Sequence, residues 1–451
     1  MDMIRRLEKI PVCAFHYRLL CITGLGWMFD AMDTGIIAFV LPTLAKAWGL
    51  TTAQMGYIGS IGLVGMALGA VLAGEFADRF GRKKMFAATL VIYSVATGLC
   101  SIAWNFEMLL IFRFLVGFGL GGQLPVAVTL VTEFSPPAKR GKFIVLLESF
   151  WGVGWLVAAL ISYLVIPRFG WHVAFIIGAL PALYVFYIWR AVPESVRYLL
   201  NKGKIEEAGK IILEIEASAG LKSAPFTKEK QEDKIVAAKV SFQEILTTAY
   251  RKRTLMLWCL WFGIVYSYYG IFTWLPSLMV TQGFTEIKTF EYVLLMTLAQ
   301  LPGYFAAAYL VDRIGRKGTL VSFLSCCAIC AYFFGRGEST SAILIWGSLM
   351  SFFNLGAWGV VYTYTPEMYP TRIRALGSGW AAAIGRIGGI LAPTIVGVML
   401  GVQQGFKDIF LMFTSVMLAV AVIVAILGPE TKGKPLDEIS EEEDKPEFSI
   451  R

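Results

Sequence analysis

Apolar stretches about as long as a membrane-crossing helix recur along almost the whole chain, and they restrict its fold more than any other feature. A helix needs about 20 apolar residues to cross the hydrocarbon core of a bilayer. Such stretches lie at 18–45, 55–77, 84–104, 107–131, 143–166, 172–192, 253–281, 290–312, 318–336, 341–364, 373–400 and 407–428. The sequence therefore predicts an all-α membrane protein with twelve transmembrane helices.

The distribution of charge also indicates a lipid bilayer as the partner of this chain. Only 16% of the residues are charged, whereas soluble domains carry about 25%. The loop lysines and arginines collect in one set of loops: Arg79, Arg82, Lys83, Lys84, Lys139, Arg140, Lys142, Arg313, Arg316, Lys317, Arg372 and Arg374. Because cationic loops stay in the cytoplasm, we expect a multi-pass protein of the cell membrane with both termini cytoplasmic. The net charge of +8 then marks the inner face, and no nucleic-acid partner is expected.

Two features that suggest a cofactor have simpler interpretations. Cys326, Cys327 and Cys330 share one apolar stretch, without the second cysteine pair or the histidines of a zinc site. The segment "GFGLGG" (117–122) has dinucleotide-binding spacing, but it lies inside an apolar stretch instead of between a strand and a helix. Small residues there let helices approach closely. We expect no metal, no cofactor and no enzymatic activity.

The chain repeats itself. "GEFADRFGRKK" (74–84) recurs as "AYLVDRIGRKG" (308–318), and "EFSPPAKRG" at Glu133 recurs at the same separation as "EMYPTRIRALG" at Glu367. Two six-span halves related as parallel repeats explain this pattern. The predicted organisation is an N-terminal six-helix half (18–192), a cytoplasmic linker with short helices (193–252), a C-terminal six-helix half (253–428) and a cytoplasmic tail (429–451).

At this level of detail the chain resembles a known family. Its D-R-x-G-R-K loops are similar to the signature of the major facilitator superfamily, and "PESVR" and "PETKGKPLDEI" to the sugar-porter and organic-ion branches. "VLLESFWGVGWLVAALISYLVIPRFGW", "FEYVLLMTLAQLPGYF" and "SFFNLGAWGVVYTYTPEMYPTRIRALGSG" resemble the bacterial niacin permeases. The resemblance implies a secondary active transporter, usually monomeric, that imports the aromatic carboxylate nicotinate by alternating access together with protons.

The resemblance also implies that the repeated charged loops form a cytoplasmic gate. Carboxylates and guanidiniums at helix ends can pair with each other and with the helix termini. The candidate gate residues are Asp78, Arg79, Arg82, Glu133, Arg140, Asp312, Arg313, Arg316, Glu367 and Arg374. The alternative is a set of solvated surface charges that only follow the positive-inside rule.

Two acids in the first apolar stretch, Asp30 and Asp33, are candidates for proton coupling. A charge in mid-membrane costs about 2.5–3.5 kcal/mol on insertion scales, so it needs a partner or a function. In similar proton-coupled sugar porters, an aspartate of the first span and an arginine of the fourth form the coupling pair, and Asp33 and Arg113 match those positions. Asp30 lies one helical turn away. The alternative is a static ion pair that only fixes helix packing.

Arg386 is the strongest candidate for substrate binding, because it lies far from either end of the eleventh stretch. In similar organic-ion transporters, this position tends to be arginine in anion carriers. Further polar and aromatic candidates are Gln300, Tyr266, Tyr269, Trp151, Asn354 and Gln123. An aromatic residue at helical spacing can equally belong to the packed core.

Several other functions remain open at this stage. The chain could be a proton symporter of other aromatic acids or of sugars, although Trp258 and Cys259 stand where sugar porters usually carry paired glutamines. A drug/proton antiporter usually shows a proline-containing motif in its fifth span, and 143–166 has no proline. A transporter-like nutrient sensor is the alternative outside transport.

Overall fold

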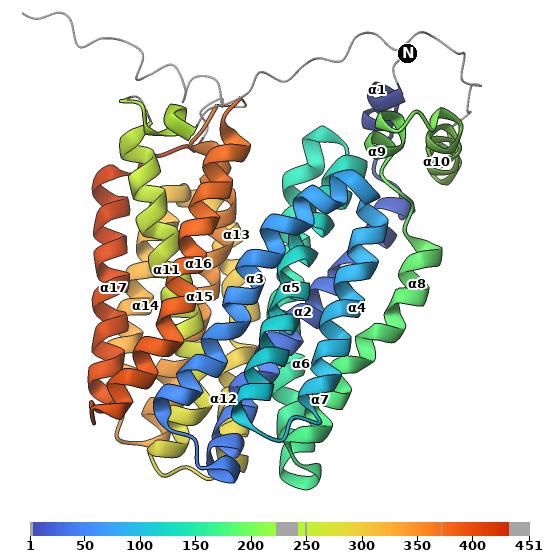
Figure 1. Ribbon diagram of the computed structural model, residues 1–451. Helices are drawn as coiled ribbons and strands as arrows, with labels where there is room; N and C mark the ends of the chain where they lie inside the picture. The colour runs from blue at the N-terminus through green and yellow to red at the C-terminus, as the bar shows by residue number, and fades with distance from the viewer. Residues whose placement is uncertain (1–2, 222–241, 249, 371, 433–451) are drawn as a thin grey trace, which may run out of the picture. The chain divides into compact units, whose positions relative to one another are not determined.

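The computed structural model describes residues 3–221, 242–248, 250–370 and 372–432, and this part of the chain is helical and contains no strand (Figure 1). Within it, eleven helical segments are long and apolar enough to cross a membrane. The remaining predicted span, 84–104, is helix α4 (Arg82–Cys100), whose basic first turn lowers its mean hydropathy. The all-α prediction is confirmed, and the total agrees with twelve spans in a multi-pass membrane protein.

The helix bounds match the predicted apolar stretches to within a few residues. Up to the predicted linker the helices are α1 (Met3–Glu8), α2 (Ala14–Trp48), α3 (Thr52–Phe80), α4, α5 (Phe106–Phe134), η1 (Pro137–Lys139), α6 (Arg140–Phe169), α7 (Trp171–Ala179), η2 (Leu180–Leu183) and α8 (Tyr184–Ala191). The described parts of the linker hold α9 (Val196–Asn201), α10 (Ile205–Ser218) and η3 (Phe242–Leu246). Then follow α11 (Arg251–Thr281), α12 (Glu286–Leu298), α13 (Gln300–Ile314), α14 (Arg316–Phe334), α15 (Thr340–Glu367), α16 (Arg374–Gly401) and α17 (Phe406–Leu427).

One predicted span, 290–312, is interrupted. Helix α12 ends at Leu298 and α13 begins at Gln300. Pro302 has no backbone N–H and cannot bond to the carbonyl four residues earlier, so the helix breaks just before it. The break leaves the polar side chain of Gln300 at the first position of α13.

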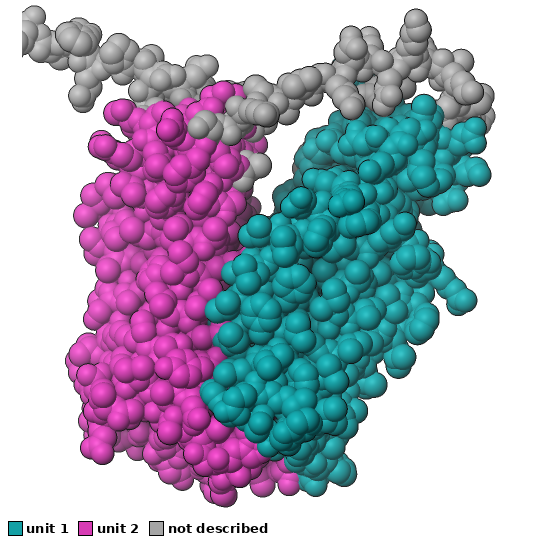
Figure 2. Space-filling view, viewed as in Figure 1, with its two compact units in different colours: residues 1–36, 61–161, 168–237 teal, residues 37–60, 162–167, 238–451 magenta. Residues whose placement is uncertain are grey.

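The described residues form two compact units (Figure 2). The first lies within 1–36, 61–161 and 168–237, and the second within 37–60, 162–167 and 238–451. In the second unit, Ser60 of α3 donates a hydrogen bond to the Ile390 carbonyl of α16 at 2.6 Å. The units therefore follow contacts between helices and not chain order, and the predicted boundaries of the two halves stay a prediction. Residues 222–241 of the predicted linker and 433–451 of the predicted tail lie outside the described residues.

Glycines allow the helices of the first unit to touch through their backbones. A Cβ atom at Gly117 would lie 1.8 Å from the Gly62 carbonyl oxygen, and one at Gly121 would lie 2.0 Å from that of Met66. Both glycines belong to the "GFGLGG" segment, which lies inside α5. The packing interpretation of this segment is supported, and no strand precedes it in the described part of the chain.

Helix α1 is joined to the linker helix α10 by an ion pair within the first unit. The Arg6 guanidinium donates two hydrogen bonds to the Glu216 carboxylate, at 2.5 and 2.6 Å. The hydrogen bond to Glu216 raises the pKa of Arg6 above its usual value. Figure 1 shows α1, α9 and α10 together at one end of this unit. The N-terminal segment and this part of the linker therefore belong to one packed structure.

Candidate functional site

The two acids of the first predicted span are both fully buried on α2, in the first unit. Arg113 of α5 donates a hydrogen bond from Nη1 to Asp33 Oδ2 at 3.1 Å, and Thr97 of α4 donates to Asp33 Oδ1 at 2.6 Å. Arg113 is itself only 4% exposed. The structure thus brings the predicted Asp33 and Arg113 together as a buried ion pair. Thr97 is a partner that sequence reasoning missed.

Asp30 lies beside this pair without sharing its hydrogen bonds. Neither carboxylate oxygen of Asp30 has a hydrogen-bond partner among the described residues. The Tyr93 hydroxyl of α4 lies close enough to interact with it electrostatically. We call Asp30, Asp33 and Arg113 the acid–arginine cluster. Because an unpaired buried charge is costly, a carboxyl without a cation next to an aspartate–arginine pair is suited to bind and release a proton.

Arg386 lies near the middle of α16, in the second unit. Among the described residues, no acidic side chain contributes to its electrostatic surroundings, whereas the hydroxyl-bearing rings of Tyr269 (α11) and Tyr362 (α15) do. The predicted Arg386 and Tyr269 therefore lie within electrostatic range of each other, as does Tyr362, which sequence reasoning missed. A guanidinium within range of phenol rings, without an acid of its own among the described residues, is suited to receive an anionic ligand.

Further aromatic rings pack around these tyrosines. Trp261 of α11 contacts Tyr362 edge-on with ring centroids 5.3 Å apart, and Trp358 of α15 contacts Tyr268 at 5.1 Å. Tyr268 in turn meets Tyr269 edge-on at 5.5 Å. We call Arg386, Tyr269, Tyr362, Trp261, Trp358 and Tyr268 the arginine–aromatic cluster. Aromatic rings grouped around one cation suit a flat anionic ring as ligand.

Three other predicted substrate residues of the second unit lie elsewhere. The Tyr266 hydroxyl donates to the Met412 sulfur of α17 at 3.1 Å, so Tyr266 faces a different helix from Tyr269. The Asn354 amide faces Cys327 of α14 at 3.8 Å. Gln300 is fully buried, and neither its amide nitrogen nor its oxygen has a hydrogen-bond partner among the described residues. Among the described residues, no hydrogen bond or ring contact joins these three side chains to the arginine–aromatic cluster.

The two remaining predicted substrate residues lie in the first unit. Gln123 of α5 is fully buried and accepts a hydrogen bond from Thr89 at 2.5 Å, while its amide nitrogen has no partner among the described residues. Trp151 of α6 packs against Trp27 of α2, with ring centroids 4.6 Å apart. Both are therefore buried in the same unit as the acid–arginine cluster.

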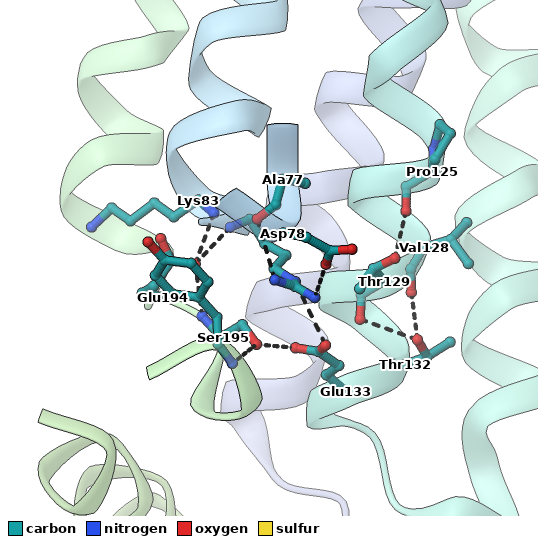
Figure 3. Close-up of polar contacts among 12 residues, drawn as sticks. Ala77, Asp78, Lys83, Pro125, Val128, Thr129, Thr132, Glu133, Glu194 and Ser195 are labelled. Atoms are coloured by element: carbon teal, nitrogen blue, oxygen red, sulfur yellow. Dashed lines mark hydrogen bonds and ion pairs between the residues drawn. The ribbon is translucent and has the colours of Figure 1, made fainter. Parts of the chain in front are cut away.

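The predicted gate of the first unit is an ordered network at the junction of α3 and α4 (Figure 3). Arg82 donates to Asp78 at 2.6 Å and lies 3.8 Å from Glu133. Glu194, after α8, accepts hydrogen bonds from the backbone N–H groups of Arg82 at 2.8 Å and Lys83 at 3.1 Å. The Ser195 hydroxyl donates to Glu133. Gly81, with φ of 107°, makes the turn that exposes these N–H groups.

The second unit repeats this network at the corresponding positions. Arg316 lies 3.2 Å from Glu367, and its backbone N–H donates to Glu430 at 2.9 Å. The Thr431 hydroxyl donates to Glu367 at 2.5 Å, as Ser195 does to Glu133. Gly315, with φ of 87°, makes the same turn. The duplicated motif therefore repeats the arginine–glutamate pair and the glutamate over backbone N–H groups, whereas no ion pair joins Asp312 to Arg316 among the described residues.

The other predicted gate residues make weaker or different contacts. Arg79 lies over the Phe80 ring at 5.3 Å, and Arg313 lies over Tyr309 at the same distance. Arg140 pairs with Glu8 at 2.9 Å, a partner outside the predicted set. Arg374 donates to the Tyr369 carbonyl at 3.2 Å, and Asp312 is exposed.

Comparison with known proteins shows which transporter family this chain matches. The family described as "Sugar (and other) transporter" matches residues 23–442. A niacin transporter of Acinetobacter baylyi is 59% identical over 97% of this chain and 100% of its own, and a putative niacin/nicotinamide transporter of Bacillus subtilis is 47% identical over 93% and 98%. The inward open structure of the xylose transporter XylE from E. coli has a TM-score of 0.75 at 18% identity, covering 94% of this chain and 99% of that chain.

Proposed function

The chain belongs to the sugar (and other) transporter family of the major facilitator superfamily, and on this premise we propose that it imports nicotinate across the cell membrane. It is a transporter and not an enzyme, because its family and its named relatives are transporters. Nicotinate as the substrate is supported by the names of two relatives that are 59% and 47% identical over nearly their full lengths.

The observation that carries the substrate class is the arginine–aromatic cluster. Arg386 offers a forked guanidinium to a carboxylate, which can accept two parallel hydrogen bonds from it. Tyr269, Tyr362 and the tryptophans beside them offer faces and edges to the ring of the same ligand. An aromatic carboxylate satisfies both halves of this cluster, whereas a sugar leaves the guanidinium without a counter-charge.

Import is coupled to protons through the acid–arginine cluster. Arg113 balances Asp33 through a buried hydrogen bond, and Asp30 has no cation of its own there. A proton that binds Asp33 removes the negative charge that Arg113 balances, and so lets the helices that carry the two residues, α2 and α5, rearrange. Releasing that proton on the other side of the membrane restores the pair.

Alternating access uses the two charged junctions as gates, with both termini in the cytoplasm and the chain acting as a monomer. In each junction an arginine side chain pairs with a glutamate, and a second glutamate accepts hydrogen bonds from backbone N–H groups. Such charge-assisted contacts are strong enough to hold one conformation and still exchange partners as the helices move.

Nicotinamide is a second candidate substrate, because the name of the Bacillus subtilis relative includes it. The test is uptake of labelled nicotinate into proteoliposomes, with and without an inward proton gradient, in competition with nicotinamide, benzoate and xylose. We expect gradient-stimulated uptake that nicotinate blocks best and xylose does not block. Uptake blocked by xylose, or no nicotinate uptake at all, would contradict the proposal.

A further inference from the structure

Helix α8 presents a groove at the surface of the first unit. The groove has a volume of about 610 Å³ and is lined by Val185, Phe186, Trp189 and Arg190. Because these positions are one and four residues apart, they share one face of the helix. Ile188 lies on the opposite side and is fully buried. The groove therefore faces away from the packed core of this unit.

The face of α8 that carries the groove is suited to contact lipid. Helix α8 is the last part of the segment 171–191, one of the eleven described segments that are long and apolar enough to cross a membrane. Only 33% of its apolar window is buried, the smallest share among these segments. Leu180, Leu183 and Phe186 are large apolar side chains that it exposes. Figure 1 shows α8 on the outer side of the first unit. We expect acyl chains of the bilayer on this face.

Two cations lie at the groove. Arg190 lines it and is exposed. Helix α4 packs against α8 and places the Lys83 Nζ atom over the Trp189 ring, 5.7 Å from its centroid. Such a cation–π contact holds the ammonium next to the groove. Among the described residues, neither cation forms an ion pair with a carboxylate. The groove thus has two positive charges available to an anionic partner.

Glu194 is the acid that acts electrostatically on Lys83, and the gate junction already uses it. Its carboxylate accepts hydrogen bonds from the backbone N–H groups of Arg82 at 2.8 Å and Lys83 at 3.1 Å. Figure 3 shows the Lys83 side chain pointing away from Asp78 of the same junction. The backbone of Lys83 therefore belongs to the gate, whereas its ammonium belongs to the groove.

We propose that this groove binds one anionic phospholipid of the cytoplasmic leaflet. Arg190 and Lys83 contact the headgroup phosphate, and Phe186 and Val185 lie along the acyl chains. A phosphate can accept two parallel hydrogen bonds from a guanidinium, and a lysine adds a point charge. Trp189 lies between the charged and the apolar ends, at the level that tryptophan favours in membranes. The inference goes beyond the proposed function and takes from it only the orientation of the chain.

The two cations favour a lipid with net negative charge. A zwitterionic lipid has the same phosphate, but its own ammonium cancels most of the attraction. Each lysine or arginine near an anionic membrane surface corresponds to about fivefold in affinity. Two of them should therefore favour phosphatidylglycerol over phosphatidylcholine by about 25-fold. Because this preference is electrostatic, it should weaken as the salt concentration rises.

The test is native mass spectrometry of the purified full chain in detergent, titrated with phosphatidylglycerol or with phosphatidylcholine of the same acyl chains. The wild type should bind one phosphatidylglycerol with the preference given above. Lys83→Gln and Arg190→Gln should each lower the preference by about fivefold, and the double variant should abolish it. Lys83→Gln keeps the backbone N–H that the gate uses. Lys202→Gln is the matched control, since its ammonium also lies 5.7 Å from a ring centroid, that of Tyr198, but outside the groove; it should change nothing.

Several results would overturn the inference. Equal affinity of the wild type for the two lipids would exclude an anionic lipid site, and a preference that survives in the double variant would place the site elsewhere. An equal loss in Lys202→Gln would mean that the overall charge of this face attracts the lipid. Displacement of phosphatidylglycerol by inorganic phosphate would indicate a site for the phosphate alone.

If a variant does not fold, the wild type still decides, because a preference that is insensitive to salt contradicts the role of the two cations. The measurement contains no nicotinate. Lipid binding can therefore fail while the proposed function stands, and the reverse.

Discussion

Arg386→Ala should weaken the binding of nicotinate much more than the binding of its neutral amide, nicotinamide. The guanidinium has no acidic partner among the described residues, so its removal leaves no buried carboxylate unpaired. A hydrogen bond to a charged group contributes about 1.5–3 kcal/mol, and each 1.4 kcal/mol is tenfold in affinity. Counting one such bond, nicotinate should bind about 10- to 150-fold more weakly, and nicotinamide should change by less than about threefold.

The assay is equilibrium binding of labelled nicotinate to the purified protein, with unlabelled nicotinamide measured by competition. Arg386→Lys should recover only part of the loss, because an ammonium supplies a point charge without the fork. Tyr266→Phe is a matched control, since its hydroxyl faces Met412, and it should leave binding unchanged. Equal losses of acid and amide in the alanine variant, together with a lower Tm, would mean that Arg386 holds helices together and does not read the charge of the ligand.

Three other changes test the remaining parts of the account. Asp33→Asn should abolish gradient-driven accumulation in proteoliposomes while nicotinate exchange persists, because the amide is nearly isosteric but carries no proton; full accumulation would exclude the coupling role. Arg82→Ala should slow uptake by several-fold with little change in nicotinate affinity. Arg79→Ala, at an exposed position, should change neither uptake nor affinity. A loss of nicotinate affinity in Arg82→Ala without a change in conformational exchange would argue against a gate. Gly117→Val should lower the Tm, because overpacking against the Gly62 backbone costs about 1–3 kcal/mol or more of folding stability. An unchanged Tm would contradict the backbone contact.

The helices could be predicted well from the sequence because hydropathy over about 20 residues reports the bilayer directly. The break between α12 and α13 was not predicted, although Pro302 was a readable signal for it. The grouping of 37–60 with the second unit was also not predicted, since it depends on contacts such as the one between Ser60 and Ile390. A tertiary contact of this kind leaves no local pattern in the chain.

The charged parts of the site were easier to predict than its neutral parts. Asp33 and Arg113 are conspicuous in apolar spans because charges are costly there, and the structure pairs them. Thr97 was missed because a single hydroxyl in an apolar run is ordinary.

Tyr266 and Tyr269 could not be separated by sequence, because α11 is apolar and buried on nearly every side. Its periodicity therefore does not reveal which face meets a ligand. The Ser195 and Thr431 hydroxyls were missed for a similar reason, since only their contacts with Glu133 and Glu367 distinguish them from other polar residues near helix ends.

The central claim, that the protein carries nicotinate together with protons, is tested most directly by following pH outside lightly buffered proteoliposomes. Nicotinate is added without a pre-formed proton gradient. Proteoliposomes with the wild type should then take up protons with nicotinate, so the external pH should rise, and protein-free liposomes should not show this rise. Asp33→Asn proteoliposomes should exchange labelled nicotinate without this pH change. Labelled nicotinate that enters wild-type proteoliposomes with no proton movement, or alkalinisation that persists in Asp33→Asn, would contradict the account.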